Sequence, residues 1–257
     1  MTVAATPVLS AVRTVRKDRF YLGMAAACVA VAVIGFMPTY WIPLMRGSLR
    51  VAPIVHLHAF FFFGWTLYLL TQARLVAAGR VMRHRELGVA GVALATGMCF
   101  VGVAAAMSSL KHLDAAGFGD AARAFSVVSL TGILLFAVLV ATALVNVRKA
   151  EVHKRLMLVA TISLLQAGVG RLFLTFLAPA GASGGAPPPV FVTVLPGLVT
   201  DLLIVAGMVH DRRTRGRVHP AYWYAGAAVL AVQLLRVPLS TTPAWTRVTE
   251  MLVAFFP

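Results

Sequence analysis

Residues 56–88, HLHAFFFFGWTLYLLTQARLVAAGRVMRHRELG, join an apolar segment to a basic cluster, with two histidines before the segment and a third within the cluster. An apolar stretch of about 20 residues is long enough to cross the hydrocarbon core of a bilayer as a helix. Clustered arginines after such a stretch are typical of a loop at the membrane surface. The segment therefore predicts one transmembrane helix that leads into a loop, and most of the chain repeats this pattern.

The composition excludes an ordinary soluble domain. Hydrophobic residues make up 60% of the chain and charged residues only 12%, and the mean hydropathy is +0.87. Soluble domains carry about 25% charged residues. The formal charge of +15 could suggest nucleic acid as a partner, but the basic residues form short clusters between apolar segments and are not interleaved with aromatic side chains. We expect the lipid bilayer, including anionic lipids, as the partner, and no nucleic acid.

Seven segments approach the length needed to cross a membrane, and in lipid their backbone groups are satisfied only within helices. The sequence thus predicts an all-α, polytopic membrane helix bundle with seven transmembrane helices in a single integral membrane domain, residues 1–257. The expected helices cover about 20–38, 53–75, 87–110, 125–147, 156–177, 190–210 and 221–238. A tail at 244–256 is expected to lie on the outer interface, because it places apolar residues at helical spacing on one face: Trp245, Val248, Leu252, Phe255 and Phe256.

The loops differ in charge from one side to the other. Most of the 23 Lys and Arg residues fall on the side of the N-terminus: Arg13, Arg16, Lys17, Arg19, Arg74, Arg80, Arg83, Arg85, Arg148, Lys149, Lys154, Arg155, Arg212, Arg213, Arg215 and Arg217. Basic loops stay in the cytoplasm. We therefore expect a multi-pass protein of the bacterial inner (plasma) membrane with a cytoplasmic N-terminus and a periplasmic or extracellular C-terminus.

Three of these loops share a spacing. A basic residue precedes a histidine by four positions at Arg80 and His84, Lys149 and His153, and Arg215 and His219. This suggests three related hairpins that follow a first helix, although short arginine-rich loops also match by chance. Internal repeats are common in membrane bundles.

Polar residues inside the apolar segments are the candidate functional residues, because ionisable groups in lipid are costly and usually face the bundle interior. The depths of the helices predict a polar pocket in the outer half, with an ion pair between Arg171 and Asp201. The expected ligand-binding set is His58, Trp65, Gln72, Gln166, Arg171, Asp201, Gln233 and Arg236. Such residues can also serve only to fix helix register, so both interpretations remain open. The dipeptide Pro196–Gly197 is expected to kink the helix one turn before Asp201.

The histidine pattern of the sequence does not support a metal or haem site. His56 and His58 are two residues apart and point roughly 200° apart on a helix, so they do not readily bind one metal together. The inner-face boundary cluster His84, His153 and His219 lies among arginines that disfavour a cation, and no HxxxH motif is present. Haem or a transition metal stays an unsupported option, and the cofactor is undetermined. Soluble-enzyme motifs such as GxSxG, HExxH and a P-loop are absent from the sequence.

With these motifs in hand, the chain resembles a group of uncharacterised bacterial multi-pass inner-membrane proteins. The resemblance covers roughly residues 52–225. It rests on the three residues His58, Trp65 and Gln72, on the loop motifs HRELG (84–88), HKRLM (153–157) and RGRVHP (215–220), and on the acidic residues Asp201 and Asp211. It implies the membrane architecture and supplies no reaction.

A non-enzymatic function is favoured, although enzymatic activity stays open. We expect binding or passage of a small molecule, lipid or ion at the outer polar pocket. Two alternatives are a haem- or metal-binding membrane redox protein and an assembly partner of a membrane complex.

Overall fold

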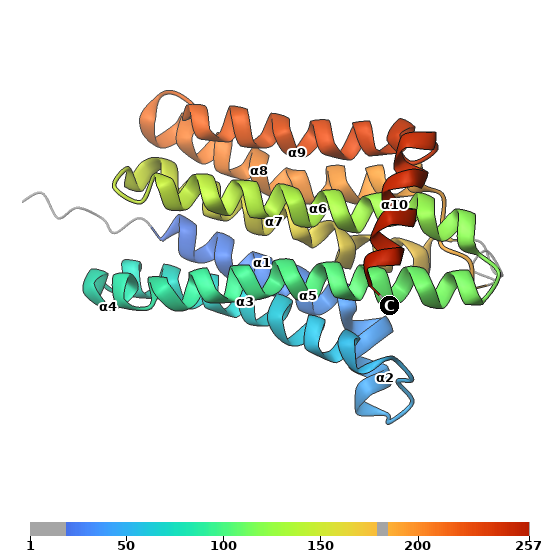
Figure 1. Ribbon diagram of the computed structural model, residues 1–257. Helices are drawn as coiled ribbons and strands as arrows, with labels where there is room; N and C mark the ends of the chain where they lie inside the picture. Colours follow the sequence, from blue (N-terminus) through green and yellow to red (C-terminus); the bar gives the residue numbers. More distant parts are fainter. Residues whose placement is uncertain (1–18, 179–184, 257) are drawn as a thin grey trace, which may run out of the picture.

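The computed structural model describes residues 19–178 and 185–256, and all regular secondary structure within these ranges is helical. Seven long helices run up and down along a common axis (Figure 1): α1 (Phe20–Phe36), α3 (Pro53–Ala77), α5 (Gly88–Ala115), α6 (Gly119–Val145), α7 (Ala150–Phe176), α8 (Val194–Arg215) and α9 (Pro220–Leu239). The predicted all-α membrane bundle is confirmed. The helices start or end up to about two turns from the predicted positions, and α6 and α7 begin earlier than expected.

Short helical elements extend or connect the long helices. A π-helical segment, Met37–Trp41, and α2 (Ile42–Met45) extend α1. The short helix α4 (Val81–Glu86) lies between α3 and α5, and a 3₁₀ turn, Val190–Thr193, precedes α8. The predicted kink at Pro196 is absent, because α8 begins at Val194 and this proline falls in its first turn. Backbone N–H groups in a first turn have no helical partner, so proline is tolerated there.

Six of the seven long helices, taken together with the short elements continuous with them, are long and apolar enough to cross a membrane. The seventh, α9, meets this criterion only together with α10 (Pro243–Phe255), which is bent away from it by 94°. The reason is its composition, since α9 carries Gln233 and Arg236 as well as two prolines. The chain is therefore a multi-pass membrane protein with six to seven candidate spans.

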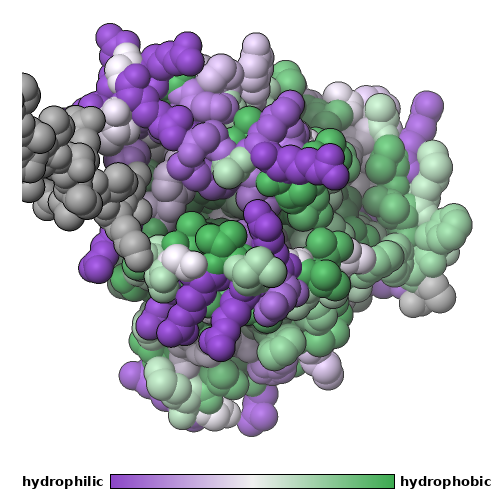
Figure 2. All heavy atoms as spheres, turned by 90° about the vertical axis from the view of Figure 1, so that its left-hand side faces the viewer, coloured by the Kyte–Doolittle hydropathy of each residue, from purple (hydrophilic) through white to green (hydrophobic). Residues whose placement is uncertain are grey.

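Basic side chains gather at one end of the bundle. This end, called the basic end below, carries α4, the α6–α7 and α8–α9 loops and the start of α1 (Figure 1). Figure 2 views the molecule from this side and shows hydrophilic side chains spread over it. Arg13, Arg16 and Lys17 lie outside the described residues.

Helix α7 lies at the centre of the bundle. It packs against α1, α6, α8 and α9, and its residues Val159, Ala160 and Ile162 are fully buried. Its contact with α1 is closest at two glycines, because a Cβ added to Gly35 would lie 2.6 Å from the Cα of Gly168. Glycine at these positions allows the two helices to approach closely.

The C-terminal helix α10 lies across α5 and α6 near the end opposite the basic end (Figure 1). Trp245, which the sequence places on the apolar face of this tail, points into the bundle. This side chain is 9% exposed, and its Nε1 donates to the carbonyl oxygen of Arg123 at 2.9 Å. Val248 and Phe255 of the same predicted face are exposed, as is Met251, because they lie on the side of α10 away from the bundle.

Candidate functional site

The eight residues of the predicted pocket do not form one site. The structure divides them into two structural contacts of α3, a polar network between α7, α8 and α9, and a pair at the α1–α3–α7 contact.

Trp65 and Gln72 stabilise helix packing. Trp65 is fully buried, its Nε1 donates to Thr161 Oγ1 at 3.0 Å, and its ring packs edge-on against Phe136. Gln72 lies two turns closer to the basic end and donates from Nε2 to the hydroxyl of Tyr68 at 2.6 Å. The Tyr68 hydroxyl in turn donates to the carbonyl oxygen of Leu87. Both predicted pocket residues are therefore occupied by contacts within the bundle.

A polar network joins α7, α8 and α9 in the half away from the basic end. Gln233 Nε2 donates to Asp201 Oδ1 at 3.2 Å, and Arg236 donates to Gln166 Oε1 at 3.1 Å and to the carbonyl oxygen of Thr193 at 3.2 Å. Gln233 and Arg236 are 3% and 2% exposed. We call these five residues the polar layer. It brings together four of the predicted pocket residues and links three helices.

Gly197 makes room for this layer. A Cβ at this position would lie 2.8 Å from Cδ of Gln233. Contacts shorter than 3 Å between carbon atoms are repulsive, so a larger residue would displace the amide from Asp201.

The predicted ion pair between Arg171 and Asp201 is not formed. Asp201 accepts from Gln233, whereas the guanidinium carbon of Arg171 lies 5.0 Å from the ring centroid of Phe36 on α1. The prediction compared depth along the bundle axis and left out direction around the helix. Gln166, which reaches α9, and Arg171 are five residues apart and thus point about 140° apart, so Arg171 faces α1.

The third group lies where α1, α3 and α7 meet at the end opposite the basic end. Aromatic rings connect it: Phe63 of α3 contacts both Phe36 and Trp41, at centroid distances of 5.6 and 4.7 Å. Arg171 lies over Phe36, and His58 stacks on Phe62 at 4.0 Å within electrostatic range of the Arg171 guanidinium.

Polar atoms in this region lack partners. Thr39 Oγ1, Trp41 Nε1 and His58 Nδ1 are buried, and none has a hydrogen-bond partner. Thr39 is four residues after Gly35, the glycine packed on α7, so it lies on the α7 side of the π-helical segment. We call Thr39, Trp41, His58 and Arg171 the donor cluster, because indole and guanidinium groups only donate and the hydroxyl and imidazole can donate as well.

The π-helical segment forms part of this site. Single π-helical turns inside α-helices are rare and are frequent at functional sites. Here the segment carries Thr39, Tyr40 and Trp41, and the Tyr40 hydroxyl bonds His56 Nδ1 at 3.0 Å. His56 is thereby held on the opposite side of α3 from His58, as the sequence predicts.

The basic end contains a buried ion-pair network that the sequence did not predict. Arg155 of α7, 1% exposed, donates through Nε and Nη2 to both carboxylate oxygens of Asp211 on α8, at 2.8 Å for the Nε bond. Its Nη1 donates to Glu151 Oε2 at 2.6 Å, and Arg215 pairs with the same carboxylate. In the sequence, the signal for this network is Asp211, an acidic residue within the arginine-rich end of a span. The same pattern is expected of a membrane boundary, so it does not identify the ion pairs.

Two tyrosines enclose this network. The guanidinium carbon of Arg155 lies 5.9 Å from the Tyr21 ring centroid and 5.6 Å from that of Tyr222. Gly207 of α8 accommodates Tyr222, since an added Cβ would lie 2.4 Å from its hydroxyl. Buried arginines are stable only when paired and bonded, so this network fixes α1, α7, α8 and α9 at the basic end.

The three boundary histidines have different roles. His153 Nδ1 bonds the carbonyl oxygen of Ala143 at 2.8 Å, and His84 lies in α4. His219 caps α9, because its Nδ1 accepts from the backbone N–H of Ala221 at 3.1 Å, while its own N–H donates to Asp211. Burial and the charge of Arg155 lower the pKa of His219. Within residues 19–178 and 185–256, no three His, Cys, Asp or Glu side chains lie close enough to hold a metal ion.

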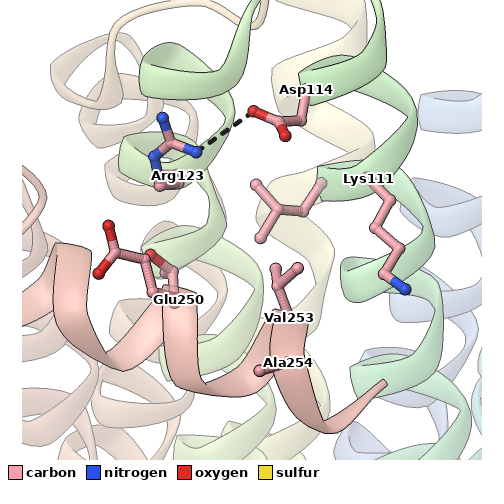
Figure 3. A pocket seen from close by; sticks show the side chains of 8 residues that line it. Lys111, Asp114, Arg123, Glu250, Val253 and Ala254 are labelled. Atoms are coloured by element: carbon pink, nitrogen blue, oxygen red, sulfur yellow. Dashed lines mark hydrogen bonds and ion pairs between the residues drawn. The ribbon is translucent and has the colours of Figure 1, made fainter. Parts of the chain in front are cut away.

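A surface pocket of about 240 Å³ lies between α5, α6 and α10 (Figure 3). Arg123 pairs with Asp114 across it at 3.2 Å, and Lys111 donates to the carbonyl oxygen of Phe256. Val253 and Ala254 of α10 form its apolar wall. These contacts occupy Arg123, Asp114 and Lys111, and the pocket lies where α10 is attached to the bundle.

No protein-family model, curated protein or solved structure matches this chain. The resemblance to bacterial inner-membrane proteins therefore stays a prediction.

Proposed function

We propose that this membrane protein binds a ligand rich in hydrogen-bond acceptors at the donor cluster. The observation that carries the proposal is the coincidence of three buried, unpartnered polar atoms, on Thr39, Trp41 and His58, with the guanidinium of Arg171. A buried polar group without a partner costs about 1–3 kcal/mol. Several such groups in one place favour a site whose partner is a ligand.

The polar layer serves a different role in this proposal. Its side chains bond one another across α7, α8 and α9, and Gly197 leaves room for Gln233; two of its atoms, Gln233 Oε1 and Arg236 Nε, have no partner. These contacts favour a structural role for Gln166, Asp201, Gln233 and Arg236, which hold the helices beside the binding site.

Binding is favoured over passage. A path to the basic end would continue from His58 along the same face of α3. Two turns further along that face lies Trp65, which is fully buried between Thr161 and Phe136. A packed, bonded indole at the centre of the bundle closes this route.

The proposal includes an orientation. We infer that the protein lies in the bacterial inner membrane with the basic end in the cytoplasm, because basic loops are retained there. The donor cluster would then lie in the periplasmic half, and α10 on the outer surface. Reporter fusions at the C-terminus test this, since alkaline phosphatase is active only outside the cytoplasm and would be inactive if the orientation were reversed.

Ligand content tests the binding function. Wild-type protein and the double variant Trp41→Phe, Arg171→Gln would be purified in a mild detergent, and compounds extracted from each would be compared by mass spectrometry. We expect a compound near equimolar amount in the wild type and depleted in the variant. Arg247→Gln, a charge-matched control on α10, should retain it. Equal content in all three proteins would refute the site.

The same purified proteins would also test the two other functions predicted from the sequence, a haem- or metal-binding redox protein and an assembly partner. A visible absorption spectrum with metal analysis would reveal haem or a transition metal. Proteins that co-purify with the wild type in stoichiometric amount would indicate an assembly partner.

A further inference from the structure

We propose that the ligand of the donor cluster is the phosphate of an anionic membrane lipid, which enters from the lipid-facing side of the α1–α3–α7 contact. This inference rests on the proposed function and specifies the chemistry of its ligand. Three features carry it: the charge of the cluster, its depth and its exposure.

The charge of the cluster is uncompensated. Arg171 forms no ion pair with any described carboxylate, and no described acidic side chain acts electrostatically on it. Its one close partner is the face of the Phe36 ring. A cation within a membrane span is costly unless it is paired, so an anionic ligand would stabilise this site.

The remaining donors match a phosphate. Trp41 Nε1, Thr39 Oγ1 and His58 Nδ1 lie at the same end of the bundle as Arg171, and each lacks a partner. A phosphate offers several acceptor oxygens, and arginine bonds it through two parallel N–H groups. A phosphate could therefore accept from Arg171 and from further donors of the cluster at once, which a single carbonyl oxygen could not.

The depth of the cluster matches a lipid headgroup. Helix α7 has 27 residues and is about 40 Å long, which exceeds the ~30 Å hydrocarbon core by about 5 Å at each end. Arg171 lies five residues, about 7.5 Å, before the end of this helix at Phe176. Its backbone is thus about 2–3 Å inside the hydrocarbon boundary, and its side chain reaches the headgroup layer.

The exposure of the cluster indicates entry from the lipid. Arg171 is exposed on the bundle surface, whereas the unpartnered atoms of Thr39, Trp41 and His58 are buried. The outer surfaces of α1 and α3 carry exposed apolar side chains, such as Ile34 at 57% and Phe60 at 71% exposure. A lipid could place its phosphate on the donors and its acyl chains along these apolar surfaces.

Native mass spectrometry tests this inference on the full chain in detergent. Phosphatidylglycerol and phosphatidylcholine with identical acyl chains would be added separately, and inorganic phosphate would be added in a third arm. We expect the wild type to retain phosphatidylglycerol about tenfold more strongly than phosphatidylcholine. Arg171→Gln should lose this preference, and Arg247→Gln should keep it.

Other outcomes overturn the inference. Equal retention of the two lipids, or an unchanged preference in Arg171→Gln, would exclude an anionic lipid at this site. Displacement of phosphatidylglycerol by millimolar inorganic phosphate would identify free phosphate as the ligand. If Arg171→Gln does not fold, Arg171→Lys provides the test, because it keeps the charge without the paired N–H groups and should retain only part of the preference.

The two proposals fail in different ways. If the extracts show a compound that depends on Arg171 but neither lipid binds preferentially, the donor cluster is a binding site for another ligand. If no compound depends on Arg171 and no lipid is retained, the proposed function itself is wrong.

Discussion

Two arginines of α7 show how differently one residue type is used along a single helix. Arg155, near the basic end, is 1% exposed and bonds Asp211 and Glu151. Arg171, sixteen residues further along, is exposed and has the face of Phe36 as its close partner. The first is paired within the chain and fixes helix positions. The second lacks a counter-charge, and for this reason we assign it to a ligand. Substitutions can test this contrast.

The largest effect is expected at the paired arginine. Arg155→Met should destabilise the fold by about 3–5 kcal/mol, because it leaves the buried Asp211 carboxylate unpaired. The free energy of unfolding in mixed micelles measures this. The double variant Arg155→Met, Asp211→Leu should recover most of the loss, since the charge is removed with its partner. If the two single losses simply added, Asp211 would not depend on Arg155.

A smaller effect is expected at the glycine that accommodates the tyrosine over Arg155. Gly207→Ala should cost about 1–3 kcal/mol, because the new methyl group would overlap the Tyr222 hydroxyl. Gly132→Ala is the matched control. It has open space around its Cβ position and should stabilise α6 by up to about 1 kcal/mol. Thermal unfolding of both variants compares them, and equal losses would contradict the packing argument.

The cap of α9 predicts a pH dependence. The pKa of His219 is lowered below the usual 6.5 by burial and by Arg155, so folding favours the neutral ring, whose Nδ1 accepts from Ala221. Its contribution is complete above pH 6.5 and is lost as the pH falls from 6.5 through the folded-state pKa. His219→Ala should cost about 1 kcal/mol at pH 8.

His219→Asn separates capping from titration. Asparagine also caps helices but does not titrate, so this variant should keep most of the stability at pH 8. Its unfolding temperature should change less than that of the wild type between pH 7 and pH 5. An identical pH dependence in both proteins would show that another group is responsible.

The smallest effect on stability is expected at the unpaired arginine. Arg171→Gln without added lipid should change the free energy of unfolding by no more than about 0.5 kcal/mol, as for other exposed substitutions. Added phosphatidylglycerol should raise the unfolding temperature of the wild type and not that of the variant. A loss comparable to that of Arg155→Met would show that Arg171 is structural.

Parts of the site were predictable because they depend on position along the chain. The depth of His58, Arg171 and Asp201 follows from the helix rise, and the opposite directions of His56 and His58 follow from the helical period. The partner of Asp201 could not be predicted this way, because it depends on how α7 is rotated and which helices surround it. Thr39 and Trp41 were missed for a similar reason, since their lack of partners is visible only in the packed bundle.

The sequence alone determined the helical class, the approximate spans and the charge difference between the two ends. These are local properties, because about 20 apolar residues in lipid must satisfy their backbone groups as a helix and because charge is read loop by loop. The tertiary structure decided which polar groups meet. Arg155 and Asp211 are 56 residues apart, and their pairing follows from the packing of α7 against α8. The same packing turns Arg171 toward α1 and leaves it without an acidic partner, because direction around a helix is fixed only by its neighbours.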